Sequence, residues 1–212
     1  MFVELIEHLR CPRPHDESSL IATASRTRER HIVDGLLGCP VCGAEFGIEN
    51  GVAHFAEPAA PTQRDAPNAE TQVRLAAFLD LTTPHGFTIL CGRWGAQADG
   101  ILRLADVRLV LVNPPADVPP DVAAAVIRTR DVVPFAPGSA QGVALHTTSA
   151  LLVDSAVQAV RAGGRVVGAA SLAMPATVTE LTRDAEMWIA ERNAVPDRYP
   201  PGLVSLKRSS RS

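Results

Sequence analysis

The chain beyond residue 69 alternates two apolar patterns. Residues 70–81 repeat apolar side chains at helical spacing, whereas residues 107–115 contain a continuous apolar run closed by prolines. The first pattern is typical of an amphipathic helix, and the second of a parallel strand buried on both faces. Strands that alternate with helices imply a mainly parallel sheet covered on both faces. We therefore expect an α/β, Rossmann-like domain in this part of the chain.

The same patterns predict the other elements of this domain. Thr177 and Glu180 have the spacing of a capping box, which favours a helix start, and Gly163-Gly164 can end the preceding helix in a left-handed cap. Helices are expected at 70–81, 96–106, 119–129, 150–162 and 177–192, and strands at 86–91, 107–115, 142–148, 165–171 and 202–208.

The first part of the chain has a different character. Residues 1–56 are rich in predicted loops and contain three of the four cysteines. Residues 57–69 carry three prolines and show no apolar period, as a linker does. We predict a small module at 1–56, a linker at 57–69 and a Rossmann-like domain at 70–212.

The cysteines of the small module indicate a metal site. Cys39 and Cys42 form a Cys-Pro-Val-Cys knuckle, and Cys11 with His15 offers the second half of a tetrahedral set. Four protein ligands make a closed site, so the predicted role of zinc is structural, in a module too small to bury an adequate core. Free thiols are the alternative for Cys39 and Cys42. Three other histidines could compete as ligands: His8, His31 and His54.

Two stretches of this module resemble a known family. "LIEHLRCP" and "GLLGCPVCGAEFGIENGVAHF" are similar to the Trm112-like zinc-ribbon family, in which an apolar helix runs into one Cys-Pro-x-Cys knuckle and a strand leads to a second. His15 stands in place of the second cysteine, with one extra residue in the spacing. The resemblance implies a small partner that stabilises and activates methyltransferases acting on tRNA, rRNA or translation factors, or a fusion to such an enzyme.

Residues 70–208 resemble a class I S-adenosylmethionine-dependent methyltransferase domain. The similarity is carried by "DVVPFAPGSAQGVALHTTSALLVDSAVQAVRAGGRVVGAA", residues 131–170. It implies a cofactor site in which Gly92 and Gly95 let the backbone approach the methionine part, Asn113 meets the ribose and Asp131 meets the adenine amino group.

The cofactor half of this resemblance departs from the family pattern. Thr88 stands at the position of an acidic residue, Leu90 at that of the first glycine and Trp94 at that of the last. Asn113 replaces the carboxylate that takes both ribose hydroxyls, and each lost charge-assisted contact costs about 1.5–3 kcal/mol. We therefore expect S-adenosylmethionine to bind weakly or not at all. No catalytic residue is assigned, since His146 and Cys91 each fit a structural role.

Charge and composition narrow the function classes. A net charge of -3 and a pI near 6.1 disfavour a protein that binds nucleic acid over its whole surface. Arg26, Arg28 and Arg30 could still form a local cationic stripe for RNA, or simply a solvated strand edge. The start of the chain lacks a signal-peptide pattern and no segment is apolar enough to cross a membrane, so a cytoplasmic protein is expected.

These observations predict a zinc-binding protein with a non-catalytic methyltransferase-like domain. Such a chain would act as an interaction or regulatory subunit, with a protein partner or a second copy of itself. Two alternatives stay open: an active methyltransferase acting on tRNA, rRNA or a protein, and an RNA-binding zinc ribbon.

Overall fold

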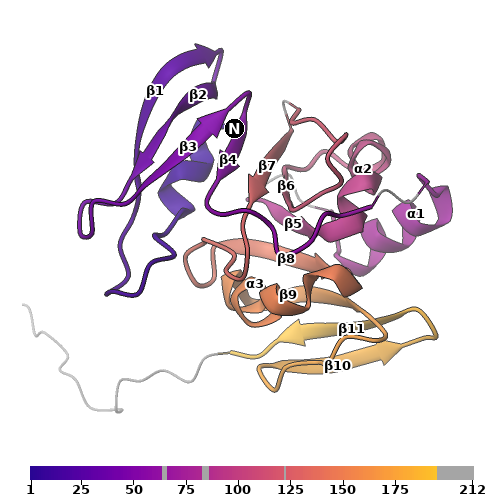
Figure 1. Ribbon diagram of the computed structural model, residues 1–212. Coiled ribbons are helices and arrows are strands. Elements are labelled where there is room, and N and C mark those ends of the chain that lie inside the picture. The colour runs from indigo at the N-terminus through magenta and orange to yellow at the C-terminus, as the bar shows by residue number, and fades with distance from the viewer. Residues whose placement is uncertain (64–65, 83–85, 122, 195–212) are drawn as a thin grey trace, which may run out of the picture.

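A single mixed sheet runs through the protein (Figure 1). The computed structural model describes residues 1–63, 66–82, 86–121 and 123–194. In these residues the sheet has eleven strands in the order β1-β2-β3-β4-β7-β6-β5-β8-β9-β11-β10. The strands are β1 (Ile21–Arg28), β2 (His31–Gly38), β3 (Glu45–Glu49), β4 (Val52–His54), β5 (Thr88–Cys91), β6 (Leu109–Val112), β7 (Ala124–Arg128), β8 (Ala140–Leu145), β9 (Val160–Ala169), β10 (Val178–Arg183) and β11 (Met187–Arg192).

The middle of the sheet is parallel and follows the doubly wound order. Strands β7, β6, β5, β8 and β9 pair in parallel, and in chain order they are the third, second, first, fourth and fifth strands of the domain. This order defines an α/β Rossmann-like fold, whose direction of winding reverses between β5 and β8. All residues of β5 and β6 are buried, as expected for strands covered on both faces.

The short module at the start of the chain continues the same sheet. Strands β1 to β4 pair antiparallel with their neighbours, and β4 then pairs in parallel with β7, Val52 lying opposite Val126. A second connection is made by Arg10 N–H, which donates to the Pro134 carbonyl at 2.9 Å. The first 56 residues therefore share a backbone hydrogen-bond network with the larger domain, and the boundaries at 57 and 69 stay a prediction.

The α-helices of the described residues are fewer and shorter than expected. Helix α1 begins where predicted, because the Asn68 side chain caps it by accepting from Glu70 N and Thr71 N. The segment 150–162 is only partly helical, since the chain enters β9 at Val160, before Gly163-Gly164. The α-helices are α1 (Ala69–Phe78), α2 (Ala98–Leu104) and α3 (Val153–Ala159), and the 3-10 helices are η1 (Val3–His8), η2 (Gly92–Gln97) and η3 (Thr147–Leu152). None of the described helices has the length and apolarity needed to cross a bilayer.

The prediction of a helix at 119–129 is wrong. This segment contains β7, which lies between β6 and β4 and hydrogen-bonds to both. Residues 124–127 are buried, so the alanines and valine fill a two-sided sheet position. Alanine favours a helix in isolation, but the free energy of burial and strand pairing exceeds this small propensity.

The prediction of a helix at 177–192 is also wrong, because these residues form the antiparallel hairpin β10–β11. Thr177 and Glu180 do not cap a helix; the Asp184 side chain instead accepts from Glu186 N and Met187 N and closes the hairpin turn. Trp188 on β11 is fully buried and its Nε1–H donates to the Leu172 carbonyl at 3.0 Å. The predicted last strand, 202–208, lies outside the described residues.

We expect Asp184→Asn to reduce stability at neutral pH by less than about 1 kcal/mol, because the carboxylate faces water. Hydrogen bonds from Glu186 N and Met187 N, together with Arg74 on α1, hold the pKa of Asp184 below its ordinary value. A carboxylate with a lowered pKa stabilises the fold above its unfolded-state pKa and loses this effect as the pH falls through the folded-state value. Urea unfolding should therefore separate the variant from the parent at pH 7, and the difference should shrink as the pH falls through the lowered pKa of Asp184, whereas Asp106→Asn, at an exposed position, should show no difference. A gap that grows on acidification would contradict this assignment.

Candidate functional site

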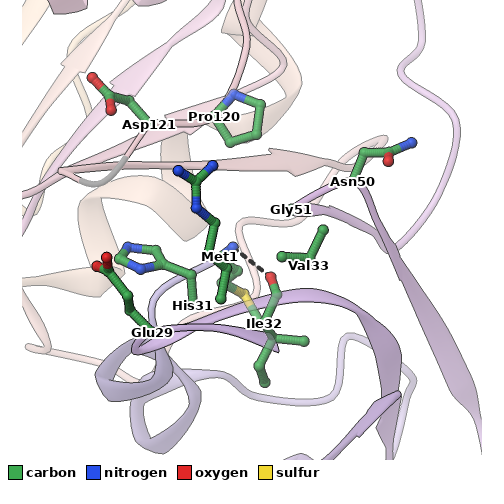
Figure 2. Close-up of a pocket in the computed structure, with 10 residues that line it drawn as sticks. Met1, Glu29, His31, Ile32, Val33, Asn50, Gly51, Pro120 and Asp121 are labelled. Atoms are coloured by element: carbon green, nitrogen blue, oxygen red, sulfur yellow. Dashed lines mark hydrogen bonds between the residues drawn. The ribbon is translucent and has the colours of Figure 1, made fainter. Parts of the chain in front are cut away.

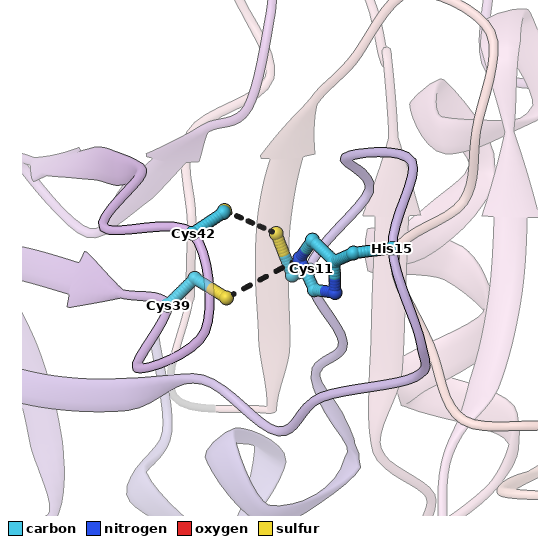
Figure 3. A group of neighbouring side chains, drawn as sticks. All are labelled: Cys11, His15, Cys39 and Cys42. Atoms are coloured by element: carbon cyan, nitrogen blue, oxygen red, sulfur yellow. Dashed lines mark hydrogen bonds between the residues drawn. The ribbon is translucent and has the colours of Figure 1, made fainter.

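Four side chains from two separate loops meet beside the strands β1–β4 of the N-terminal module (Figure 3). Cys39 follows β2 and Cys42 lies in the turn before β3, while Cys11 and His15 come from the loop after η1. The ligand atoms of these four residues all lie within 4.8 Å of one another. The structure thus brings together the four residues that the sequence predicted as a metal site.

Two distances within this cluster match those expected around a tetrahedral zinc ion. Cys11 Sγ lies 3.8 Å from Cys42 Sγ, and Cys39 Sγ lies 3.4 Å from His15 Nε2. Zn–S bonds of about 2.3 Å and Zn–N bonds of about 2.0 Å at tetrahedral angles separate two sulfurs by about 3.8 Å and a sulfur from a nitrogen by about 3.5 Å. A disulfide would need about 2.05 Å between the sulfurs, so the cysteines are unpaired thiols.

The surroundings of His15 suit metal binding. Its Nδ1 lies 2.6 Å from the Asp16 carbonyl oxygen, a contact that fixes the proton on Nδ1. The lone pair of Nε2 then faces Cys39 and the centre of the cluster. A neutral imidazole with this tautomer is a standard zinc ligand.

The thiols differ in how readily they ionise. Burial raises the pKa of Cys39, but hydrogen bonds from the backbone N–H groups of Cys42 and Val41 outweigh it and lower the pKa to about 6. Burial raises the pKa of Cys11 to about 11, and its sulfur neighbours Cys39 and Cys42 add to that rise. Part of the rise at Cys11 is repulsion from the Cys39 sulfur, and a divalent cation is the group that would offset that repulsion.

The three competing histidines lie elsewhere. His8 packs against the Phe87 ring at 5.4 Å, and His31 meets the edge of Phe2 at 6.5 Å. His54 is exposed on β4, and none of these three belongs to the described cluster.

The glycines of the predicted cofactor loop are packed against protein. Gly92 has a φ of +67°, and a Cβ there would lie 2.4 Å from Thr148 Oγ1. A Cβ at Gly95 would lie 2.6 Å from the Pro114 Cβ. In a cofactor loop glycine leaves room for the ligand, but here the space beside each glycine holds the loops that follow β8 and β6.

The other two predicted cofactor residues are placed differently. Asn113, at the end of β6, is buried; its Oδ1 accepts from Thr129 N at 2.9 Å and its Nδ2 donates to the Thr129 carbonyl at 2.8 Å. This side chain ties the ends of β6 and β7 together. Asp131 is exposed in the connection after β7.

The linker crosses the same edge of the sheet, a feature that the sequence did not reveal. Thr62 Oγ1 donates to the Asn113 carbonyl at 2.9 Å, and Arg93 donates to Gln63 Oε1 at 3.4 Å. Asn68 N–H then donates to Gln97 Oε1 at 3.0 Å before α1 begins. From β4 the described linker residues thus pass over the carboxyl ends of β6 and β5 (Figure 1). A run of prolines and polar residues signals a linker but not the surface on which it lies.

A cleft of about 380 Å³ borders the carboxyl ends of β8 and β9. Trp94 and His146 lie side by side on its wall, with ring centroids 5.8 Å apart and an edge-to-face angle of 80°. His146 Nδ1 accepts from Thr148 N at 3.3 Å and caps η3, in keeping with a structural role for that nitrogen.

A second cleft, also of about 380 Å³, lies at the start of the chain (Figure 2). The Met1 amino group donates to the Ile32 carbonyl at 2.8 Å, and burial lowers the pKa of that amine to about 6. Arg28 lines this cleft, while Arg26 pairs with Asp34 and Arg30 with Glu4. Two arginines of the predicted cationic stripe are therefore neutralised by carboxylates.

No protein-family model and no curated protein matches the chain. Solved structures with a similar backbone include geranyl diphosphate C-methyltransferase from Streptomyces coelicolor A3(2), at 14% identity and a TM-score of 0.40, which covers 47% of this chain and 44% of that one. Another is a Methanococcus maripaludis protein classed as an S-adenosyl-L-methionine-dependent methyltransferase, at 8% identity and a TM-score of 0.47, covering 62% of this chain and 87% of that one. The chain thus spans less than half the length of the C-methyltransferase. The fold assignment rests on the strand order described above.

Proposed function

We propose that this protein is a zinc-binding, methyltransferase-like subunit that acts through binding to another protein rather than through catalysis. Zinc is the ion proposed because three sulfurs and one imidazole nitrogen form the donor set that it prefers. With four protein ligands the ion would join the loop at 11–15 to the turn at 39–42. It would supply folding free energy and no open position for a substrate.

The absence of catalysis is proposed from the packing at the carboxyl edge of the sheet. In Rossmann-like folds this edge holds the ligand, near the reversal between the first and fourth strands. Here Gly95 lies against Pro114, Asn113 is bonded to Thr129, and the linker residue Thr62 lies over Asn113. An S-adenosylmethionine molecule would have to displace these contacts, and that filled edge is the observation that carries the proposal.

The proposed binding surface is the exposed face of strands β1 and β2. Ile21 on β1 and Leu36 on β2 project to the same side of the sheet, because Ile21 lies opposite Gly38 and Leu36 opposite Thr23. They are 62% and 44% exposed, and Val41, between the two knuckle cysteines, is 62% exposed. Two exposed apolar side chains on one face of the sheet, with a third in a neighbouring turn, favour a protein partner or a second copy of the chain.

The test is a calorimetric titration of the zinc-loaded, folded chain with S-adenosylmethionine and with S-adenosylhomocysteine. We expect no saturable heat with either compound. Saturable one-to-one binding at micromolar concentrations would overturn the non-catalytic assignment, because it would show that the edge opens for the cofactor. The melting temperature of the same sample verifies that silence comes from folded protein.

Methyl transfer is the second candidate function, favoured by the cleft beside Trp94 and His146. This cleft borders the end of β8, next to the winding reversal at which Rossmann-like folds bind ligands. The same titration decides between the two, since a methyltransferase must bind its methyl donor.

A further inference from the structure

We propose that Cys11 and Cys42 are a redox modification site: a hydroperoxide converts this pair to a disulfide and releases the metal. The inference rests on the zinc site proposed above and adds a regulation that a structural site alone does not require. It follows from an asymmetry in the cluster, in which the four ligands differ in exposure and in the neighbour that each faces.

Exposure selects the sulfur that reacts first. Cys42 is exposed, Cys11 is partly exposed and Cys39 is 3% exposed. A peroxide in solution therefore reaches the Cys42 sulfur most directly, because accessibility is one of the two factors that govern thiolate oxidation. The fourth cysteine of the chain, Cys91, is 0% exposed on β5 and provides an internal control.

Position selects the partner sulfur. Cys11 Sγ and Cys42 Sγ, the two more exposed sulfurs, lie 3.8 Å apart, whereas Cys39 Sγ, a neighbour of both, is buried and lies 3.4 Å from His15 Nε2 (Figure 3). Closing the first pair to a bond of about 2.05 Å requires an approach of about 1.8 Å, within reach of side-chain rotation and a small loop shift. The two cysteines come from different loops, so the bond would replace the metal as a covalent link between residues 11 and 42.

The oxidant in the proposed reaction is a hydroperoxide, which accepts two electrons. The Cys42 thiolate attacks the peroxide, an S–O bond forms, the O–O bond breaks, and the leaving oxygen takes a proton to give water or an alcohol. The Cys11 thiolate then attacks the Cys42 sulfenic acid, the S–S bond forms, and the hydroxide leaves as water after protonation. Two electrons pass from the two sulfurs to the peroxide.

Loss of these two ligands would release the ion, because Cys39 and His15 alone supply half of the tetrahedral set. The loop would remain closed at its base, where Arg10 pairs with Glu17 at 2.8 Å and Cys11 N–H donates to the Ser18 carbonyl at 3.0 Å. The segment between these contacts, residues 12–16, is thus the part expected to gain freedom. A dithiol reductant and zinc should restore the original state.

The experiment uses the full zinc-loaded chain and hydrogen peroxide. Zinc release is followed with a chromogenic chelator, and the disulfide is mapped by mass spectrometry of peptides with free thiols blocked. We expect release of one zinc ion per chain, loss of two hydrogens, a Cys11–Cys42 cross-linked peptide and an unmodified Cys91. Dithiothreitol plus zinc should reverse both signals, and Cys91→Ala should behave like the parent chain.

Several results would overturn the proposal. Retention of zinc under peroxide, a Cys39–Cys42 cross-link in place of Cys11–Cys42, or oxidation without a cross-link would each contradict it while leaving the zinc site intact. A freshly purified chain that takes up no zinc before any oxidant is added would instead refute the proposed zinc site. Because the decisive mapping is made on the parent chain, it does not depend on whether a Cys42→Ser variant folds.

Discussion

Cys39→Ser is expected to abolish stoichiometric zinc binding and to lower the free energy of unfolding by about 4 kcal/mol, a large effect of the kind that follows loss of a metal ligand. Cys39 is the buried member of the cluster and lies 3.4 Å from His15 Nε2, so its replacement removes a ligand that no described neighbour can supply. For a chain of this size the melting temperature should fall by roughly 8–16 °C. Unfolding should not be complete, because β4 stays paired with β7.

The matched control is His54→Ala, which removes a possible zinc ligand that lies outside the cluster on the exposed side of β4. It should leave zinc content and melting temperature unchanged, whereas His15→Ala should behave like Cys39→Ser. Metal analysis after dialysis and calorimetric melting make the comparison. Equal zinc content in Cys39→Ser and the parent chain would refute the assignment of this ligand.

Asn113→Asp, which would restore the carboxylate of the methyltransferase pattern, is expected to destabilise the protein by about 3 kcal/mol and not to create a cofactor site. The Asn113 amide donates to the Thr129 carbonyl, and a carboxylate there would set two oxygens against each other in a buried position. The melting temperature should fall by roughly 6–12 °C.

The loss of stability caused by Asn113→Asp should become smaller as the pH falls. Burial and the Thr129 carbonyl would raise the pKa of the new carboxyl above its unfolded-state value of about 4. The folded variant would then bind the proton more tightly than the unfolded chain, so its deficit should be complete above the raised pKa and should shrink as the pH falls. Urea unfolding from pH 7 to pH 4 measures it. A variant as stable as its parent that binds S-adenosylmethionine would show that Asn113 lies in an open cofactor site.

The four clustered Cys and His residues were accessible from the sequence because their chemistry is local. Cys39 and Cys42 come together through one tight turn. The spacing of Cys11 and His15 likewise suggested a second pair of ligands. Strands β5 and β6 were likewise predictable, since short, buried and mainly apolar runs leave little choice of structure.

The segments 119–129 and 177–192 were misassigned because their local preferences were weak. The alanines of β7 take a strand conformation only because β4 and β6 supply hydrogen bonds on both sides. The apparent capping box at Thr177 belongs to a hairpin whose stability comes from burial of Trp188 and the turn at Asp184. Both outcomes depend on partners distant in sequence, which a periodicity does not contain.

Gly92 and Gly95 show the same difference between what the sequence determines and what the tertiary structure determines. The resemblance to methyltransferases led to the prediction that Gly92 and Gly95 lie in a cofactor loop and that Asn113 stands where the family has a carboxylate. Only the folded chain decided what fills the space beside them: Thr148, Pro114 and the bond from Asn113 to Thr129. The sequence determines which side chains are present, and these determine which hydrogen bonds and metal bonds can form. The occupant of a given volume is set by loops that approach from other parts of the chain, because packing depends on all of them at once.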